Sequence, residues 1–278
     1  MKFSLCAARN LGIAGVAAAV IALAPVAGAA APADPALQSL VAGAQRKPAY
    51  AARDRFRHPA EVLHFFGLEP TDTVVEILPG GGYWTEILAP YLKTHGRYIA
   101  ALAPDASSAE MKAMNPRFRA KLKADPKLYG KVTISTFDGD KAAIAPAGSA
   151  DLVVTFRNLH NWMEAGDAPA VLHAFYQALK PGGVLGMTDH RGRIDRPQDP
   201  TAKDGYVRQD YAIKLAEKAG FRFVGSSEVN ANPRDTKDYP AGVWTLPPTY
   251  RLGDKDRAKY QAIGESDVFV LKFVKPKG

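Results

Sequence analysis

The chain has 278 residues, of which 47% are hydrophobic and 23% charged, so it can form one sizeable core, and global disorder is excluded. Lys2 and Arg9 lie in the first 29 residues, which are set aside below. The remaining chain has 34 Lys and Arg residues and 28 Asp and Glu residues, a modest net charge of +6. We interpret this charge mainly as a determinant of solubility, while contact with an acidic membrane surface stays open. The only cysteine, Cys6, lies in the first 29 residues, so no disulfide or thiol chemistry is expected beyond them.

The first 29 residues have the pattern of a secretory signal peptide. Lys2 and Arg9 precede an uncharged stretch from Leu11 to Ala33, and Ala27-Gly28-Ala29 is a small-residue cleavage site. The stretch is long enough to span a bilayer, but its prolines and many small residues make it a poor membrane helix. We therefore expect residues 1–29 to be removed on export to the periplasm. Residues 30–58 are then a lead-in, and residues 59–278 form one domain.

Strands and helices alternate after the lead-in. Pro59 suits a first helical turn and Gly67 suits a C-cap, so a short helix is expected over Ala60–Phe66. A buried strand over Thr73–Leu78 is followed by apolar residues at helical spacing from Trp84 to Leu92. Further strands are expected over Arg97–Leu102, Val132–Phe137, Leu152–Phe156, Val184–Asp189, Phe221–Val229 and Asp267–Val274.

Helices are expected between most of these strands. They are a basic helix over Glu110–Lys127 interrupted at Pro116, a helix marked by apolar residues from Leu172 to Leu179, and a helix over Val207–Ala219. The basic helix lacks interleaved aromatic residues, which argues against nucleic-acid binding. Only a Pro-rich excursion separates the last two strands, so these are expected to be antiparallel. The pattern predicts an α/β protein with a Rossmann-like, doubly wound, mostly parallel seven-stranded sheet and an antiparallel last strand.

Three consecutive glycines, Gly80, Gly81 and Gly82, follow the strand Thr73–Leu78 and directly precede a helix. Glycine permits positive φ and close approach of a ligand, and a helix N-terminus offers N–H groups to a negative ligand group. A dinucleotide fingerprint is incomplete, because Thr85 stands where its third glycine belongs. Ligands of open α/β sheets bind at the carboxyl ends of the strands, so the glycine turn predicts a ligand site there.

This turn resembles the first motif of class I S-adenosylmethionine-dependent methyltransferases, in which an acid precedes a glycine-rich turn. Glu76, Gly80 and Gly82 match, and Leu78 replaces the earliest glycine. The segments SADLVVTFRNLHNW, VLHAFYQALKPGGVLGMTDHR and AEKAGFRFV resemble later parts of the family in the same order, over roughly Thr73–Val229. More narrowly, RHPAEVLHFFGL, PGGGYWTEILAPYL and RNLHNW resemble a group of exported bacterial proteins called predicted methyltransferases.

The resemblance implies S-adenosylmethionine as the cofactor and a set of residues around it. That set comprises Glu76, Gly80, Gly81, Gly82, Tyr83 and Asn158, with Asp138 or Asp140 in the place of the acid that follows the third strand. The family's ribose-binding acid has no counterpart at the end of the second strand, which reads YIAALAPDA, and Asp105 comes late.

Several aromatic and basic side chains are further candidates for this site. Tyr83 and Trp162 are candidates for an aromatic wall, whereas Trp84 fits the core face of its helix. Arg53, Arg57 and His58 precede the first helix, where they either close over the cofactor's carboxylate or form a solvated basic face.

Two histidines leave the fourth and fifth strands on the expected ligand side, and Asp189 stands beside His190 at the end of the fifth strand. A neutral histidine there can take a proton from a nucleophile, so His160 is our first candidate for a general base, with His190 or Asp189 next. The alternative is a pair of structural histidines bonded to loop carbonyls. The trio could also ligate a metal, but no close ligand spacing such as H-E-x-x-H supports this, so no metal is expected.

These observations predict an S-adenosylmethionine-dependent methyltransferase that acts on an unidentified small molecule in the cell envelope. As the resemblance implies it, the cofactor is made in the cytoplasm, so the signal peptide and the fold point in different directions. A non-catalytic periplasmic ligand-binding protein on a methyltransferase scaffold is the alternative, and the missing ribose acid favours it. A serine hydrolase is disfavoured because no G-x-S-x-G is present. The methyl acceptor and the oligomeric state stay open.

Overall fold

One sheet carries the fold, with seven strands in the order β3-β2-β1-β4-β5-β7-β6. The neighbours from β3 to β5 pair in parallel, and β7 pairs antiparallel with both β5 and β6. The fold class expected from the sequence is therefore confirmed. The strands are β1 (Thr73–Ile77), β2 (Arg97–Leu102), β3 (Thr133–Thr136), β4 (Ala150–Phe156), β5 (Leu179–His190), β6 (Arg222–Ser227) and β7 (Val268–Val274).

The computed structural model describes residue 1 and residues 34–139 and 141–278, so the expected signal peptide and Asp140 lie outside the described residues. No helix in this part of the chain combines the length and the apolar character needed to cross a membrane. The helices are α1 (Pro35–Val41), α2 (Pro48–Ala51), α3 (Asp54–Arg57), α4 (Pro59–Phe66), α5 (Thr85–Leu92), α6 (Ala109–Ala124), α7 (Pro126–Tyr129), α8 (Leu159–Ala165), α9 (Ala168–Ala178), α10 (Gln209–Lys218) and α11 (Arg257–Ile263), with 3-10 turns η1 (Asp105–Ser107) and η2 (Gly242–Thr245).

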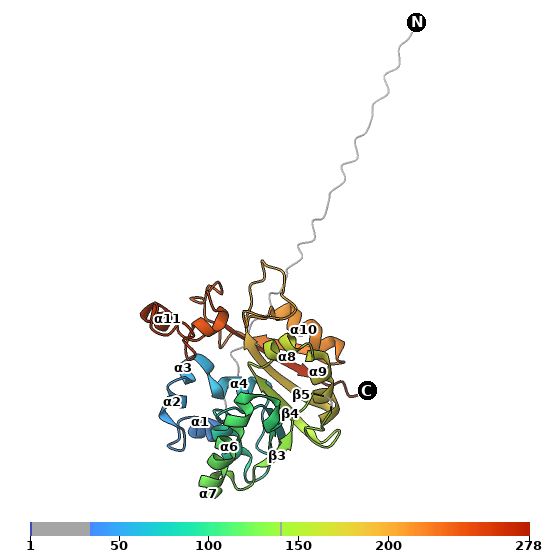
Figure 1. Cartoon of the computed structure of the whole chain (residues 1–278). Helices are drawn as coiled ribbons and strands as arrows, with labels where there is room; N and C mark the ends of the chain where they lie inside the picture. The colour runs from blue at the N-terminus through green and yellow to red at the C-terminus, as the bar shows by residue number, and fades with distance from the viewer. Residues whose placement is uncertain (2–33, 140) are drawn as a thin grey trace. The chain divides into compact units, whose positions relative to one another are not determined.

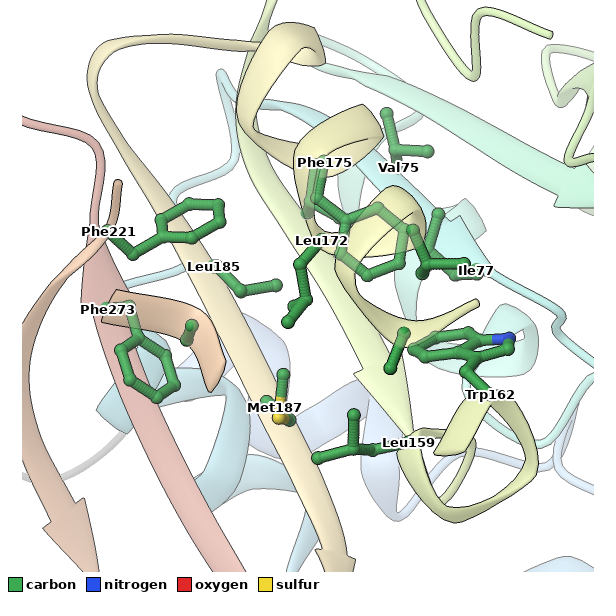
Figure 2. Close-up of a cluster of buried hydrophobic side chains, with 14 of the residues drawn as sticks. Val75, Ile77, Leu159, Trp162, Leu172, Phe175, Leu185, Met187, Phe221 and Phe273 are labelled. Carbon is green, nitrogen blue, oxygen red and sulfur yellow. The ribbon is translucent and has the colours of Figure 1, made fainter. Parts of the chain in front are cut away.

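Helices cover both faces of the sheet, and each face has its own apolar core. On one face, α8 and α9 pack on the central strands and α10 packs on β6 and β7 (Figure 1). Figure 2 shows this core, with Leu172 and Phe175 of α9 facing Val75 and Ile77 of β1. The core on the other face joins α1, α4, α5 and α6 to the sheet, with Phe66, Ile87 and Phe118 among its fully buried side chains.

The side chains of β1 alternate between these two cores, as the period of a strand requires. Val75 and Ile77 belong to the α9 side, and Val74 belongs to the α5 side. Glu76 has the same parity as Val74, so its carboxylate points toward α5 rather than out of the strand end. This parity decides where the predicted cofactor acid lies.

Several local expectations differ from the structure. Pro116 does not interrupt α6, which runs from Ala109 to Ala124. Pro116 and Lys112 are both exposed, so the carbonyl that loses its helical partner lies on the solvated side of the helix. Leu179 opens β5 instead of closing the preceding helix. The lead-in carries helices that the sequence did not indicate, and α1 packs into the core beside α5.

A close contact between β5 and α4 predicts a sensitive position in the core. A Cβ added at Gly186 would lie 2.5–2.7 Å from ring carbons of the buried Phe66. Because Phe66 cannot move out of a packed core, we expect Gly186→Ala to lower the free energy of unfolding by about 1–3 kcal/mol in chemical denaturation. Gly225→Ala in β6 is the matched control, since no described atom lies within 4 Å of its added Cβ. Equal stability of the two variants would contradict this packing.

Candidate functional site

A cavity of about 580 Å³ opens at the carboxyl ends of the parallel strands, where the sequence predicted a ligand site. The exits of β1, β2 and β4, the end of β5, helix α6 and the segment around η2 form its walls. Among the residues that line it are Leu78, Gly80, Ala103, Met114, Asn115, Arg157, Asn158, His160, His190 and Trp244.

Of the three glycines, only Gly80 lines this cavity. It has a positive φ of 57°, and a Cβ added there would meet only the Met114 sulfur, at 3.6 Å. A Cβ at Gly81 would lie 2.3 Å from the Tyr50 hydroxyl oxygen, and one at Gly82 would lie 3.2 Å from Cε of Lys121. Gly81 and Gly82 therefore make room for the protein's own side chains, which differs from the expected cofactor contacts.

Two residues without a glycine's freedom adopt left-handed conformations at the cavity. Leu78, in the place of the family's earliest glycine, has φ 51°, and Arg157, directly after β4, has φ 62°. Such a conformation costs a non-glycine residue on the order of 1–3 kcal/mol and is concentrated at functional sites. Both residues line the cavity. The strain thus lies at two strand exits that face a prospective ligand.

Glu76 does not line the cavity, because its parity turns it toward α5. It is 1% exposed and accepts hydrogen bonds from the hydroxyls of Tyr98 and Thr85. Burial raises the pKa of the Glu76 carboxyl to about 7, although these hydrogen bonds oppose the shift. The structure gives Glu76 a role inside the α5 layer rather than direct contact with a ligand.

The aromatic candidates also lie away from the cavity. Tyr83 is buried, its hydroxyl donates to Asp54, and the Arg57 guanidinium lies 4.5 Å from its ring centre. Trp162 packs against Phe137 and Phe175 in the core of Figure 2. Only Arg157 and Asn158 separate β4 from helix α8, and this short connection turns the indole onto the sheet. Trp84 stacks on Phe156, with ring centres 3.8 Å apart, as expected for core packing.

The remaining cofactor candidates separate into one that reaches the cavity and two that do not. Asn158 lines it, and its Nδ2 donates to the Ile77 carbonyl at 3.3 Å. Asp138 lies outside the lining. Asp105 accepts from Arg119 at 2.9 and 3.0 Å and from Asn115 Nδ2 at 2.8 Å, so it is paired at the surface and does not line the cavity.

The catalytic candidates are brought together by one buried carboxylate. Asp189 is fully buried and accepts from the main-chain N–H of His160 at 3.0 Å and of His190 at 2.7 Å. Its Oδ1 also lies 2.8 Å from His160 Nδ1. Burial works to raise the pKa of Asp189, but the two imidazoles and these hydrogen bonds outweigh it and hold the pKa below its ordinary value. An ionised Asp189 requires His160 Nδ1 to be the donor, which leaves Nε2 able to accept a proton.

His190 is buried beside this pair, with the ring centres of the two histidines 5.3 Å apart. Its Nδ1 lies 2.5 Å from Ser266 Oγ. Burial lowers the pKa of His190 to about 3, so its ring is neutral at physiological pH. Ligand atoms of His160, Asp189 and His190 lie within 4.8 Å of one another, a spacing that a metal ion could use. The Asp189 oxygens already accept three hydrogen bonds. We therefore interpret this carboxylate as a group that orients His160 rather than as a metal ligand.

The sequence did not single out several residues of the cavity. Trp244 lies in the Pro-rich excursion, and its ring centre is 6.0 Å from the ring centre of His160. The guanidinium carbon of Arg251 lies 4.3 Å from the centre of the Trp244 ring. Met111, Met114 and Asn115 come from α6, which the sequence marks mainly by its basic residues. Arg157, which the sequence did not single out, meets the sequence candidate Arg53 at Glu265, more than a hundred residues along the chain from Arg157. Local spacing carries no signal for contacts of such long range.

Comparisons with known proteins agree with this architecture. A scan of protein-family models and a search of curated proteins returned no match. Among solved structures, a SAM-dependent methyltransferase from Aquifex aeolicus superposes with a TM-score of 0.55 at 17% identity, covering 86% of this chain and 98% of that one. The [4+2]-cyclase SpnF superposes with a TM-score of 0.56 at 17% identity, covering 87% and 92%.

A third structure, phosphoethanolamine N-methyltransferase 2 of Haemonchus contortus in complex with S-adenosyl-L-methionine, superposes with a TM-score of 0.51 at 17% identity, covering 80% of this chain and 53% of that one. The chain therefore has the fold of the class I methyltransferases. At these identities the likeness establishes the fold, and the chemistry must be argued from the site.

The buried Glu76 carboxyl predicts a pH-dependent stability. Its pKa is about 7 in the folded chain and 4.5 ordinarily, so the folded state holds an extra proton between these values. Stability from this proton is present at low pH and is lost as the pH rises from about 4.5 to about 7, by roughly 3 kcal/mol. Denaturant titrations should show this loss for the wild type and the exposed-site control Glu61→Gln, and a flatter profile for Glu76→Gln. A profile unchanged by Glu76→Gln would refute the shift.

Proposed function

We propose that the protein is an S-adenosylmethionine-dependent methyltransferase acting on a small molecule in the cell envelope. The observation that carries this proposal is one cavity that joins the Gly80 turn to the buried His160–Asp189 pair. The fold adds support, because the cavity lies at the ligand edge of a class I methyltransferase sheet. The envelope location rests on the signal-peptide pattern of residues 1–29.

The residues present fit such a cofactor. A volume of about 580 Å³ lies within the usual range of small-molecule sites. Leu102, Met111 and Met114 offer apolar and polarizable contacts of the kind that suit a purine ring, while Asn115 and Asn158 offer amide groups. The Gly80 turn and the end of β2 would hold the adenosyl part. S-adenosylmethionine supplies an electrophilic methyl group on a positively charged sulfur.

The protein's own part in the transfer is alignment and proton removal. With a hydroxyl or amine acceptor aligned to the methyl group that the cofactor would supply, His160 Nε2 would take the proton that the acceptor loses. Asp189 holds the His160 ring in the required tautomer and stabilises the imidazolium that forms. Trp244 and the segment around η2 line the cavity together with α6 and limit the access of water.

A second candidate function is a non-catalytic ligand-binding protein on the same fold. The observation that favours it is the end of β2, where Ala103 stands in place of the family's ribose-binding acid and Asp105 is paired with Arg119. The likeness to a cyclase also indicates that this fold does not by itself imply methyl transfer. The His160–Asp189 pair favours the enzyme, because a simple binding site has no need of an oriented base.

Cofactor binding separates these two functions. In calorimetry with S-adenosylhomocysteine, we expect the full-length chain to bind and Ala103→Trp to weaken binding by at least about tenfold, because the indole fills the cavity at the end of β2. Ala120→Trp, on the exposed side of α6, is the control and should bind like the wild type. Absence of binding at millimolar ligand would support the non-catalytic alternative.

Turnover tests the base. With a small-molecule extract of the cell envelope as the source of acceptor, we expect His160→Gln and Asp189→Asn to lower the release of S-adenosylhomocysteine by about 100-fold or more. Their affinity for S-adenosylhomocysteine should stay close to that of the wild type, because the loss lies in proton transfer. His173→Gln, at an exposed position of α9, controls for the substitution itself. An undiminished rate in His160→Gln would remove His160 from this role.

A further inference from the structure

Three arginines converge on a single carboxylate beside the cavity. Glu265, which is 5% exposed, accepts two bonds from Arg53, from Nε at 2.5 Å and from Nη2 at 3.1 Å. It also accepts from Arg57 Nε at 3.3 Å and Arg157 Nη1 at 3.0 Å. Arg53 and Arg157 also line the cavity, whereas Glu265 lies behind them. The arginines come from α3 and from the exit of β4, and Glu265 comes from the residues just before β7.

The charges of this cluster do not balance. Three guanidinium groups face Glu265, and Asp189 adds a second negative charge that acts on Arg157. His190 is neutral because burial lowers its pKa to about 3. Glu110, the acid that lines the cavity, is exposed on α6. One positive charge is therefore left over at a mostly buried site, where charge is poorly screened and strongly favours an anion.

The arginines also have unused donor capacity. Arg57 is 8% exposed and does not line the cavity; its Nη2 has no hydrogen-bond partner among the described residues, and its guanidinium lies over the Tyr83 ring. Arg157 gives one N–H to Glu265, while its guanidinium can offer up to five donors. Its backbone is held at φ 62°, so the chain keeps an arginine at a position where glycine would be unstrained. Planar donor forks of this kind match carboxylate and phosphate groups.

Arg157 and Glu265 lie on the base side of the sheet, whereas Arg57 also reaches the Tyr83 ring beside the glycine turn. Arg157 and His160 both follow β4, and His190 ends β5, next to β7 and Glu265 in the sheet. The Gly80 turn and Ala103 follow β1 and β2, on the opposite side of β4. The donors are therefore placed to hold the molecule that reacts at His160, with Trp244 against the same ring.

We propose that Arg53 and Arg157, braced by Glu265, form a subsite for the anionic group of the methyl acceptor, which is a small carboxylate- or phosphate-bearing molecule. The inference rests on the proposed function and narrows it to an acidic acceptor whose nucleophilic atom faces His160 Nε2. Arg57 holds Glu265 in place and keeps it paired when either of the other arginines is removed.

Calorimetry on the full-length chain saturated with S-adenosylhomocysteine tests this subsite. The probes are para-hydroxybenzoate and phenyl phosphate, with para-hydroxybenzyl alcohol as the neutral match. We expect at least one anion to bind about tenfold or more tighter than the alcohol, and the stronger of the two identifies carboxylate or phosphate as the preferred group. Arg157→Gly, which relaxes the backbone at that position, should abolish the preference, and Arg157→Lys should keep part of it.

The affinity for S-adenosylhomocysteine separates this inference from the function on which it rests. We expect Arg157→Gly to leave it within about twofold of the wild type. Equal binding of the anions and the alcohol by the wild type would overturn the subsite while leaving the methyltransferase intact. It would also be overturned if Arg157→Gly weakened S-adenosylhomocysteine but not methylthioadenosine, which lacks a carboxylate, because the arginines would then serve the cofactor.

Discussion

The arrangement of the site depends on the buried carboxylate of Asp189. A lone carboxylate without solvent would be strongly unfavourable, and here hydrogen bonds from His160 and His190 compensate for the lost hydration. The same hydrogen bonds hold the first turn of α8 against the end of β5. Because β5 pairs with β4, which precedes α8, the His160 imidazole has a fixed position relative to the sheet. Asp189 therefore affects both the stability of the fold and the chemistry of the site. Its hydrogen bond with His160 Nδ1 offsets the lost hydration of the carboxylate and also sets the tautomer of His160.

The other half of the cavity is braced by residues from the beginning of the described chain. The Tyr50 hydroxyl donates to the Gly81 carbonyl at 2.8 Å, and Asp54 joins Tyr83 to Arg46. The three glycines thus serve two purposes. Gly80 presents bare main chain to the cavity, while Gly81 and Gly82 let this N-terminal layer and α6 approach the turn. A rigid turn on one side and an oriented base on the other suit a reaction that depends mainly on alignment.

The sequence predicted the fold well because the two patterns that indicate it, the spacing of apolar residues and the turn residues, are local. Apolar runs and their spacing indicated the strands, and turn residues indicated their ends, so even the antiparallel β7 was anticipated. It predicted His160, Asp189, His190, Asn158 and Gly80 near one edge because strand exits in a parallel sheet meet there. It could not assign Glu76 or Trp162, since their direction depends on strand parity and on where α8 begins. Arg157 with Glu265, and Trp244 with His160, are contacts between distant segments that no spacing reveals.

The central claim is that an adenosyl compound binds at the carboxyl edge of the sheet between the Gly80 turn and His160. A crystal structure of the protein with S-adenosylhomocysteine measures this directly. We predict ligand density along Gly80 and Ala103, with the sulfur atom toward His160. A cavity filled by the protein's own side chains, or a ligand bound elsewhere, would contradict the account and leave the fold alone as its result.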